Sequence, residues 1–239
     1  MADASPMIDA ATVDAGLVDS GTPDTGPADT GPVDTGPPPP DQDRDGIPDD
    51  EDPEPQRVNP PLLNDPFNEN GDWIFSSVSM EIDGAEGVLT VDAIEPFERE
   101  GWIGPRGAWA DYFIRSLIRV DEVGTSNDAR SGHAGVIARV VQVTPSRYLT
   151  CGIDLKLGRV VLAAHEGTSR TVLAEAPTSA VPGTWLKLGF TALRNAFICE
   201  IGGVRVEGAS ALFDAGSVGF RSYDATFAAD WIEVYEILP

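Results

Sequence analysis

The stretch YFIRSLIRV, Tyr112 to Val120, repeats with a period of two and places Arg115 and Arg119 on one face. Successive side chains of a β-strand point to opposite faces, so this alternation predicts a strand with one face buried. The same period recurs in three other segments, VSMEI at 78–82, WLKLGF at 185–190 and FICEIGGVRV at 197–206. All of these segments are therefore predicted to form strands.

Turn signals separate the predicted strands. They are Asp83-Gly84, NDARSGHAG at 127–135, Leu157-Gly158, Pro182-Gly183 and Gly202-Gly203. No segment has an apolar stripe of helical period longer than about two turns. In a chain of 239 residues, this pattern predicts one all-β domain of roughly a dozen strands, arranged as a two-sheet antiparallel sandwich.

The chain is strongly acidic, with 39 Asp and Glu against 16 Lys and Arg. Nucleic acids and anionic membrane surfaces attract basic patches, so neither is an expected partner. No run of about 18 apolar residues occurs, and no transmembrane segment is expected. Residues 1–61 hold 15 of the acids and no aromatic residue, so they cannot bury enough apolar area to offset the entropy of ordering.

Residues 1–40 contain a five-residue repeat in which an aspartate is followed by a small residue and a glycine. Its aspartates are Asp14, Asp19, Asp24, Asp29 and Asp34. Such units cannot build a packed solenoid, so we predict a disordered acidic tether. The segment resembles the tether of bacterial surface lipoproteins, which implies a bacterial surface address and a lipid anchor upstream of Met1.

The stretch DQDRDGIPDDED, Asp41 to Asp52, is the most specific short motif in the chain. Its alternating carboxylates, with Gly46 at the sharp turn, follow the ligand spacing of calcium loops. The predicted Ca²⁺ ligands are the side chains of Asp41, Asp43, Asp45, Asp49 and Asp52 and the carbonyl of Ile47. The motif resembles a single thrombospondin type 3 repeat. The alternative is an acidic linker that attracts calcium only diffusely.

Calcium binding at this loop is expected to be weak, with a dissociation constant of about 10⁻⁴ to 10⁻³ M, as in extracellular modules. Residues 41–61 are predicted to link the tether to a sandwich at 62–239. Because the loop lies outside the predicted core, we expect calcium to order it and shorten the linker. We expect the melting temperature of the sandwich to change little.

The end of the chain carries the clearest family resemblance. GSVGFRS at 216–222, followed by FAADWIEVY at 227–235, resembles the closing strand pair of concanavalin A-like lectins and glucanases. Within that superfamily the chain is most similar to laminin G-like and 3-keto-disaccharide hydrolase-like domains of bacterial secreted proteins. The resemblance covers roughly residues 63–239 and implies a jelly-roll sandwich.

The two cysteines are each in phase with apolar residues of a predicted strand, so both are expected on buried faces. Cys151 shares its phase with Leu149 and Ile153, and Cys199 with Phe197 and Ile201. An even cysteine count in an exported chain favours a Cys151–Cys199 disulfide. Two separate buried thiols are the alternative.

Glu81, Asp83 and Glu86 have the E-x-D-x-x-E spacing of the catalytic strand in laminarinase-like β-glucanases. A retaining glycosidase needs its two carboxyl groups about 5 Å apart. Here the Asp83-Gly84 turn signal interrupts the motif, so Glu81 and Glu86 are predicted to lie on different strands or in the loop. We therefore interpret the match as coincidental and do not expect this kind of glycosidase.

The remaining candidates for ligand binding are aromatic residues and an arginine. Trp102 and Trp109 flank a Gly/Pro-rich loop in which an indole ring could stack on a sugar, and Arg139 and Tyr148 lie on or beside central strands. Packing in the core is the alternative for each Trp. His133 and His165 are predicted to lie in exposed loops without a role.

These observations favour a tethered extracellular module, expected to be monomeric, that binds a glycan or another cell-surface component without catalysis. One alternative is a glycoside or keto-glycoside hydrolase that uses Glu81, Glu86 or Asp230. Another is a structural stalk-and-head surface protein without a small ligand.

Overall fold

The computed structural model describes residues 40–43, 45–69, 73–75, 80–94, 99–103, 108–125, 132–141 and 147–239. At residues 74–75 and 99–103 it describes the backbone alone. The predicted tether therefore lies outside the described residues, apart from Pro40. Pro39 to Pro239 form one compact unit, which contains both the sandwich and the segment Asp41 to Asp52, which we call the acidic loop.

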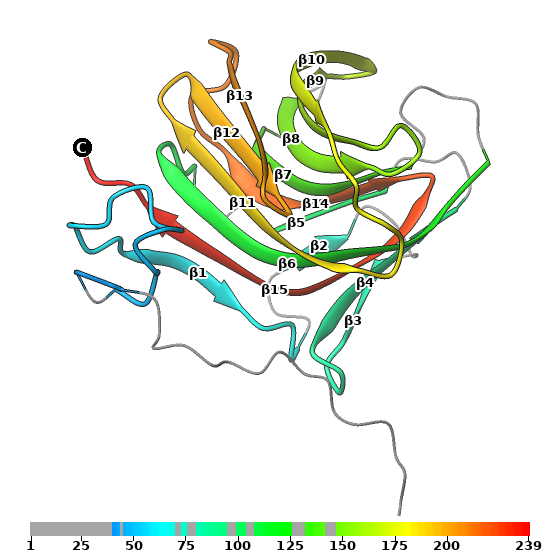
Figure 1. Cartoon of the computed structure of the whole chain (residues 1–239), viewed down its shortest axis with the longest axis horizontal. Helices are drawn as coiled ribbons and strands as arrows, with labels where there is room; N and C mark the ends of the chain where they lie inside the picture. Colours follow the sequence, from blue (N-terminus) through cyan, green and yellow to red (C-terminus); the bar gives the residue numbers. More distant parts are fainter. Residues whose placement is uncertain are drawn as a thin grey trace, which may run out of the picture. The chain divides into compact units, whose positions relative to one another are not determined.

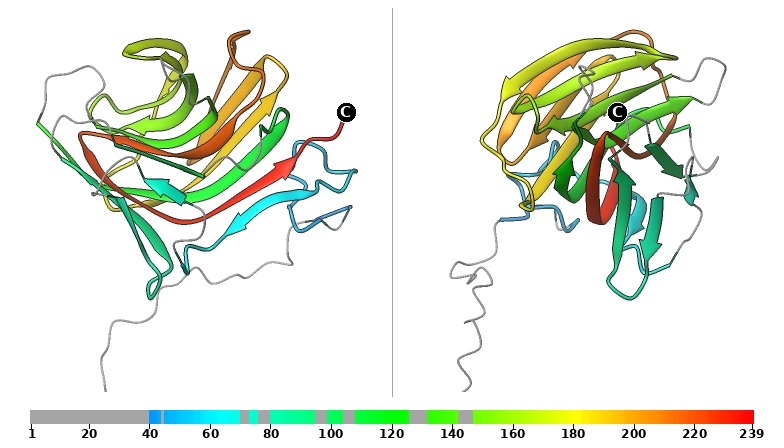
Figure 2. Two further views of the ribbon diagram at one scale, coloured as in Figure 1. Left: turned by 180° about the vertical axis from the view of Figure 1, so that it is seen from behind. Right: turned by 90° about the vertical axis from the view of Figure 1, so that its right-hand side faces the viewer.

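The described residues contain strands and no helix, and the strands form two antiparallel sheets, as predicted (Figure 1). The order in the eight-stranded sheet is β13 (Val204–Ala209), β12 (Ala196–Ile201), β11 (Trp185–Leu193), β6 (Tyr112–Val123), β15 (Ala225–Glu236), β4 (Val88–Ala93) and β3 (Met80–Asp83), with β1 (Pro61–Asp65) also paired to β15. The order in the seven-stranded sheet is β10 (Ser169–Pro177), β9 (Arg159–Glu166), β8 (Arg147–Asp154), β7 (His133–Val141), β14 (Ser217–Tyr223), β5 (Arg99–Ile103) and β2 (Trp73–Phe75). Figure 2 shows the two sheets as curved layers that face each other.

Three of the four alternating segments form strands as their period predicts, and the described part of the fourth, Met80 to Ile82, lies in β3, while Val78 and Ser79 lie outside the described residues. YFIRSLIRV lies within β6 and WLKLGF within β11, and FICEIGGVRV forms β12 and β13 around a turn at Gly202-Gly203. Both glycines of this turn have positive φ, 57° and 80°, which glycine adopts without the steric cost of a Cβ atom. The other turn signals in the described residues also fall between strands.

The hydrophobic core fills the space between the two sheets. β6 contributes Ile114 and Ile118, while the seven-stranded sheet contributes residues such as Leu149 and Phe220. Phe220 lies at the centre of an aromatic group, with ring centroids 5.8 Å from Trp73, 5.9 Å from Phe67 and 5.7 Å from Phe227. Such aromatic contacts add to the stabilisation that burial provides.

The predicted disulfide is present and joins the two sheets. Cys151 lies on β8 and Cys199 on β12, with their Cα atoms 5.4 Å apart. Both side chains are completely buried, as their phase with apolar neighbours predicted. The bond therefore crosses the core and ties one layer of the sandwich to the other.

Candidate functional site

The seven-stranded sheet is unusual because its central strands are buried on both faces. On β7, Ala134, Val136 and Ala138 point into the core between the sheets. The alternate residues of β7, β8, β9 and β14 point away from the core, yet most of them are also buried. We call seven buried residues of this second side the polar face: His133, Tyr148, Thr150, Asp154, His165, Arg221 and Tyr223.

The prediction that the two histidines lie in exposed loops is wrong. His133 is the first residue of β7 and is 1 % exposed, and His165 lies on β9 and is 3 % exposed. In register, His133 stands between Tyr223 of β14 and Asp154 of β8. The strand register therefore places the imidazole of His133 between the phenol of Tyr223 and the carboxyl group of Asp154 on three adjacent strands.

A glycine makes room for the His133 ring. A Cβ atom added at Gly152 would lie 2.5 Å from Cε1 and 2.6 Å from Nε2 of His133. Gly152 pairs with Gly135 of β7, so the middle of the polar face has two neighbouring positions without side chains. The imidazole lies directly over the backbone of β8 for this reason.

A second group on the polar face combines aromatic rings with a buried guanidinium. The Tyr148 and His165 rings are stacked, with centroids 4.7 Å apart and an interplanar angle of 15°. Thr150 Oγ1 lies 3.3 Å from His165 Nε2. The Arg221 guanidinium carbon lies 5.9 Å from the Tyr148 ring centroid and 5.7 Å from that of Tyr223, within the range of cation–π attraction.

Asp154 is the carboxyl group of the polar face and is completely buried. Its Oδ1 accepts a hydrogen bond from the Leu157 amide at 2.9 Å, while Oδ2 has no hydrogen-bond partner among the described residues. Burial raises the pKa of Asp154, although the charge of Arg170 partly opposes the shift. A buried carboxyl group with a raised pKa can bind a hydroxyl group or donate a proton.

The four predicted ligand residues do not form one site. Tyr148 belongs to the polar face, and the backbone of Trp102 pairs with Gly219 of β14, although the Trp102 side chain is outside the described part. Trp109 is half-buried, packs against the core and makes an edge contact with Tyr112 at 6.4 Å. Trp109 and Arg139 therefore belong to a different region from Tyr148.

Arg139 is 0 % exposed and its guanidinium binds the protein itself. It donates to the carbonyl of Ala110 from Nε at 3.0 Å and from Nη2 at 2.6 Å, and to the carbonyl of Arg194 from Nη1 at 2.5 Å. Nη1 also donates to the carbonyl of Phe213. The residue has φ of +49° at an irregularity in β7, so these bonds stabilise the bulge, and we assign Arg139 a structural role.

The E-x-D-x-x-E acids lie on a hairpin of the eight-stranded sheet, as the turn signal predicted. Glu81 and Asp83 are exposed on β3, and Glu86 is exposed in the turn that leads to β4. Asp83 Oδ1 accepts hydrogen bonds from the amides of Ala85 at 3.0 Å and Glu86 at 3.3 Å. Asp83 therefore stabilises the turn between the two glutamates.

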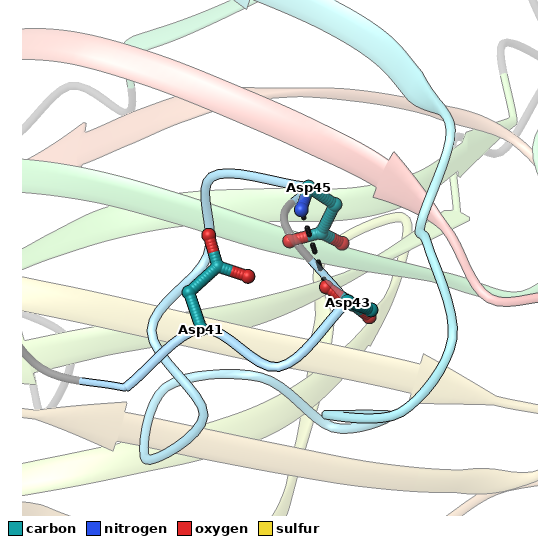
Figure 3. A group of neighbouring side chains, drawn as sticks. All are labelled: Asp41, Asp43 and Asp45. Carbon is teal, nitrogen blue, oxygen red and sulfur yellow. Dashed lines mark hydrogen bonds between the residues drawn. The ribbon is translucent and has the colours of Figure 1, made fainter.

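Three carboxylates of the acidic loop converge. One oxygen atom from each of Asp41, Asp43 and Asp45 lies within 4.8 Å of the other two (Figure 3). Oxygens bound to one Ca²⁺ at about 2.4 Å cannot be more than about 4.8 Å apart, so these positions fit a single ion. Asp49 takes another role in the described loop, since its Oδ1 accepts a hydrogen bond from the Gln42 amide at 2.9 Å.

The acidic loop is packed on the sandwich, which corrects the expectation of a linker independent of the fold. The Ile47 side chain is completely buried in a cluster with Phe113, Tyr235 and Ile237. Glu51 makes an ion pair with Arg115 of β6 at 2.6 Å and another with Lys187 of β11. The prediction failed because these partners lie far from the loop in sequence.

Comparisons with known proteins identify the fold at the level of its class. The sequence matches no protein-family model and no curated protein sequence. Solved structures that resemble the chain are galectin-like and concanavalin A-like jelly-roll proteins. The predicted fold class is therefore confirmed.

Three of these structures show the breadth of the class. The carbohydrate-binding module CBM66 from Bacillus subtilis has a TM-score of 0.58 at 16 % identity, covering 69 % of this chain and 96 % of that one. The β-glucanase of Bacillus licheniformis has a TM-score of 0.53 at 10 % identity, and the match covers 76 % of this chain and 100 % of the glucanase. The VIP36 lumenal domain, in its Ca²⁺/Man3GlcNAc-bound form, has a TM-score of 0.53 at 13 % identity, and the match covers 72 % of this chain and 86 % of that domain. At these identities the likeness establishes the fold alone.

A search for membrane-spanning helices is negative for the described residues. None of the secondary structure described is a helix with the length and apolar character needed to cross a bilayer.

Proposed function

We propose that this protein is an extracellular carbohydrate-binding module whose ligand contacts the polar face of the seven-stranded sheet. The observation that carries the proposal is the set of buried polar side chains on the side of β7, β8, β9 and β14 away from the core. Core packing does not require polar groups there, and burying them costs free energy unless they are hydrogen-bonded. A group of buried side chains that can donate and accept hydrogen bonds is therefore a candidate ligand-binding site.

The chemistry of the polar face suits a sugar. Carbohydrates present hydroxyl groups that both donate and accept hydrogen bonds, and apolar ring faces that stack on aromatic rings. The polar face contains the rings of Tyr148 and Tyr223, with Arg221 as a donor and Asp154 as an acceptor. These four side chains are at most 5 % exposed, so the proposal requires that the chain covering this side of the sheet opens when a sugar binds. The carbohydrate-binding module and the glycan-bound VIP36 domain with the same fold support this assignment.

The proposal also includes a cellular location and a bound calcium ion. We propose a bacterial surface location, in which a lipoprotein-type tether carries the module and the thrombospondin type 3-like loop binds Ca²⁺ weakly. The convergence of Asp41, Asp43 and Asp45 supports the calcium site. A weak site would be filled at the millimolar calcium of an extracellular medium, so the site and the location support each other.

Binding to immobilised polysaccharides tests the glycan proposal. Full-length protein in millimolar calcium is run through a panel of neutral and acidic polysaccharides by affinity electrophoresis, and a retained pair is measured by calorimetry. We expect Arg221→Met to weaken binding at least tenfold, which corresponds to about 1.4 kcal/mol. Arg205→Met, at an exposed position on β13, is the matched control.

Two results would count against the glycan site. One is the absence of retention by any polysaccharide, which would favour a stalk-and-head protein without a small ligand. The other is unchanged affinity in Arg221→Met. If Arg221→Met does not fold, Tyr223→Phe removes a single hydroxyl from the same face, and the same comparison applies.

A hydrolase is the second candidate, because Asp154 combines complete burial with a raised pKa. A carboxyl group that acts as a general acid needs a raised pKa so that it carries a proton near neutral pH. The fold is shared with a β-glucanase. Asp154 replaces Glu81 and Glu86 as the acid to test, since those two are exposed on the hairpin. Release of reducing sugar that Asp154→Asn abolishes without loss of binding would establish hydrolysis, whereas binding without sugar release favours the module.

A further inference from the structure

Two buried residues are linked to the carboxylate cluster by hydrogen bonds: Asp52, the last residue of the acidic loop, and Asn59, which follows the loop. Asp52 is 8 % exposed, and its Oδ2 is buried without a hydrogen-bond partner among the described residues. Asn59 is 1 % exposed, and its Oδ1 is likewise buried without a partner in the described part. A buried oxygen atom loses its hydration, and a hydrogen-bond donor or a bound cation can offset that loss.

Asn59 connects Asp52 to the three converging carboxylates. Its backbone amide donates to Asp45 Oδ2 at 2.9 Å, and its side-chain amide donates to Asp52 Oδ1 at 2.9 Å. Asn59 therefore bridges the Asp52 carboxylate to Asp45, a member of the cluster, through these two hydrogen bonds. Asn59 lies outside the twelve-residue motif, two positions before β1 begins at Pro61.

The acidic loop and the segment around Asn59 are held to the eight-stranded sheet on either side of this cluster. Ile47 packs against Phe113 and Tyr235, and Glu51 pairs with Arg115. Arg57 Nη1 donates to the carbonyls of the last two residues, Leu238 at 2.9 Å and Pro239 at 3.0 Å. These contacts come from the second half of the loop and from Arg57 after it, so the conformation of the loop depends on the sandwich.

We propose that Asn59, together with Asp52 of the motif, completes the calcium site, and that bound calcium clamps the acidic loop to the eight-stranded sheet. The inference rests on the calcium binding proposed above and adds one ligand from outside the motif, Asn59, and a structural role. The carboxylates of Asp41, Asp43 and Asp45 already converge. If the ion draws in Asp52, the Asn59 amide oxygen and the Ile47 carbonyl, the site has six oxygens, the lower end of the range for Ca²⁺. Without the ion, the repulsion between the carboxylates opposes the docked conformation.

Calorimetric titration of calcium into full-length, chelator-treated protein tests the added ligand. We expect Asn59→Leu to weaken calcium binding at least tenfold, and Asn59→Asp to restore or exceed the wild-type affinity. Aspartate supplies a ligand oxygen but cannot donate to Asp52, so the rescue distinguishes a ligand from a hydrogen-bond donor. Asn64→Leu, at an exposed position on β1, is the matched control and should bind like wild type.

Thermal unfolding with and without calcium tests the clamp. At about 100 times the dissociation constant, calcium should raise the melting temperature by about 5 to 10 °C. By linkage, Ile47→Ala should weaken calcium binding several-fold although it removes no ligand atom. Ile201→Ala, which truncates a buried isoleucine on β12, should lower the melting temperature and leave the calcium affinity unchanged.

The outcomes separate this inference from the calcium site itself. Calcium binding by wild type with unaltered affinity in Asn59→Leu would remove Asn59 from the site and leave the proposed loop site standing. Binding without a rise in melting temperature, and with normal affinity in Ile47→Ala, would overturn the clamp. No heat of binding at 10 mM calcium, or equal binding of Mg²⁺, would overturn the calcium site and the inference together.

Discussion

Loss of the Cys151–Cys199 disulfide should be a severe perturbation of this sandwich. The bond joins β8 of the seven-stranded sheet to β12 of the eight-stranded sheet, and both cysteines are completely buried. Reduction leaves every side chain in place and removes only the connection between the layers. The effect of the crosslink can therefore be measured without a change of sequence.

The expected size follows from the length of chain that the disulfide closes. The sequence separation of the two cysteines is 48 residues. The chain-entropy relation for a loop of that length gives about 4 kcal/mol in favour of the folded state. For a domain of this size, such a loss corresponds to a fall in melting temperature of about 8 to 16 °C.

Urea unfolding of wild type with and without a strong reductant measures this quantity. We expect reduction to lower the free energy of unfolding by about 4 kcal/mol and to raise the m-value, because an uncrosslinked unfolded chain exposes more surface. The Cys151→Ala/Cys199→Ala variant is the control and should not respond to reductant. A reduction effect below about 1 kcal/mol, or one seen equally in the variant, would refute the reasoning.

Two further predictions concern buried charged residues. Arg139→Met should lower the free energy of unfolding by about 2 to 4 kcal/mol, because it leaves the buried Phe213 carbonyl without a donor and weakens the bulge. If this variant and the exposed-site variant Arg205→Met were equally stable in urea, the structural role of Arg139 would be contradicted. Burial raises the pKa of Asp154 above its ordinary value of 3.8, so the folded state holds this proton more tightly and its contribution to stability is lost as pH rises through the folded pKa. The stability of Asp154→Asn relative to wild type should therefore increase from pH 4 to pH 7 in urea titrations, and a decrease over that range would show that ion pairing outweighs burial.

The fold could be predicted from sequence because its signals are local. The period of two at Tyr112–Val120 and the glycine turns specify strands and their ends, whatever the strands pack against. The burial of Cys151 and Cys199 could be predicted because each shares a phase with apolar neighbours, and their pairing was favoured because the chain has only these two cysteines. These features depend on residues close together in the chain, which a single sequence displays directly.

The polar face was missed because its burial depends on tertiary structure. His133 lies within the turn signal at 127–135, which by itself predicts a loop. A signal was nevertheless present: HAGVIARVV has apolar residues at both phases of the strand period. Such a run is typical of a strand that is buried on both faces, and it would have placed His133 inside the protein.

The acidic loop shows the same division between local and distant information. Its carboxylate spacing predicted the convergence of Asp41, Asp43 and Asp45, which requires only the turning backbone of the loop itself. Its docking depends on Phe113 and Tyr235, which are remote in sequence from Ile47. Nothing in the sequence marked Asn59, because the residue lies outside the motif and its importance arises from the fold.

The position of the last two strands determines when the fold can be completed during synthesis. β15 lies between β6 on one side and β4 and β1 on the other, and β14 lies between β7 and β5. Until the ribosome has made them, the strands before and after residue 110 have no common partner in either sheet, and their edges are open to wrong pairing. Truncation before β14 would therefore divide both sheets, and a nascent chain can close its core only after β15, which ends at Glu236, has been made.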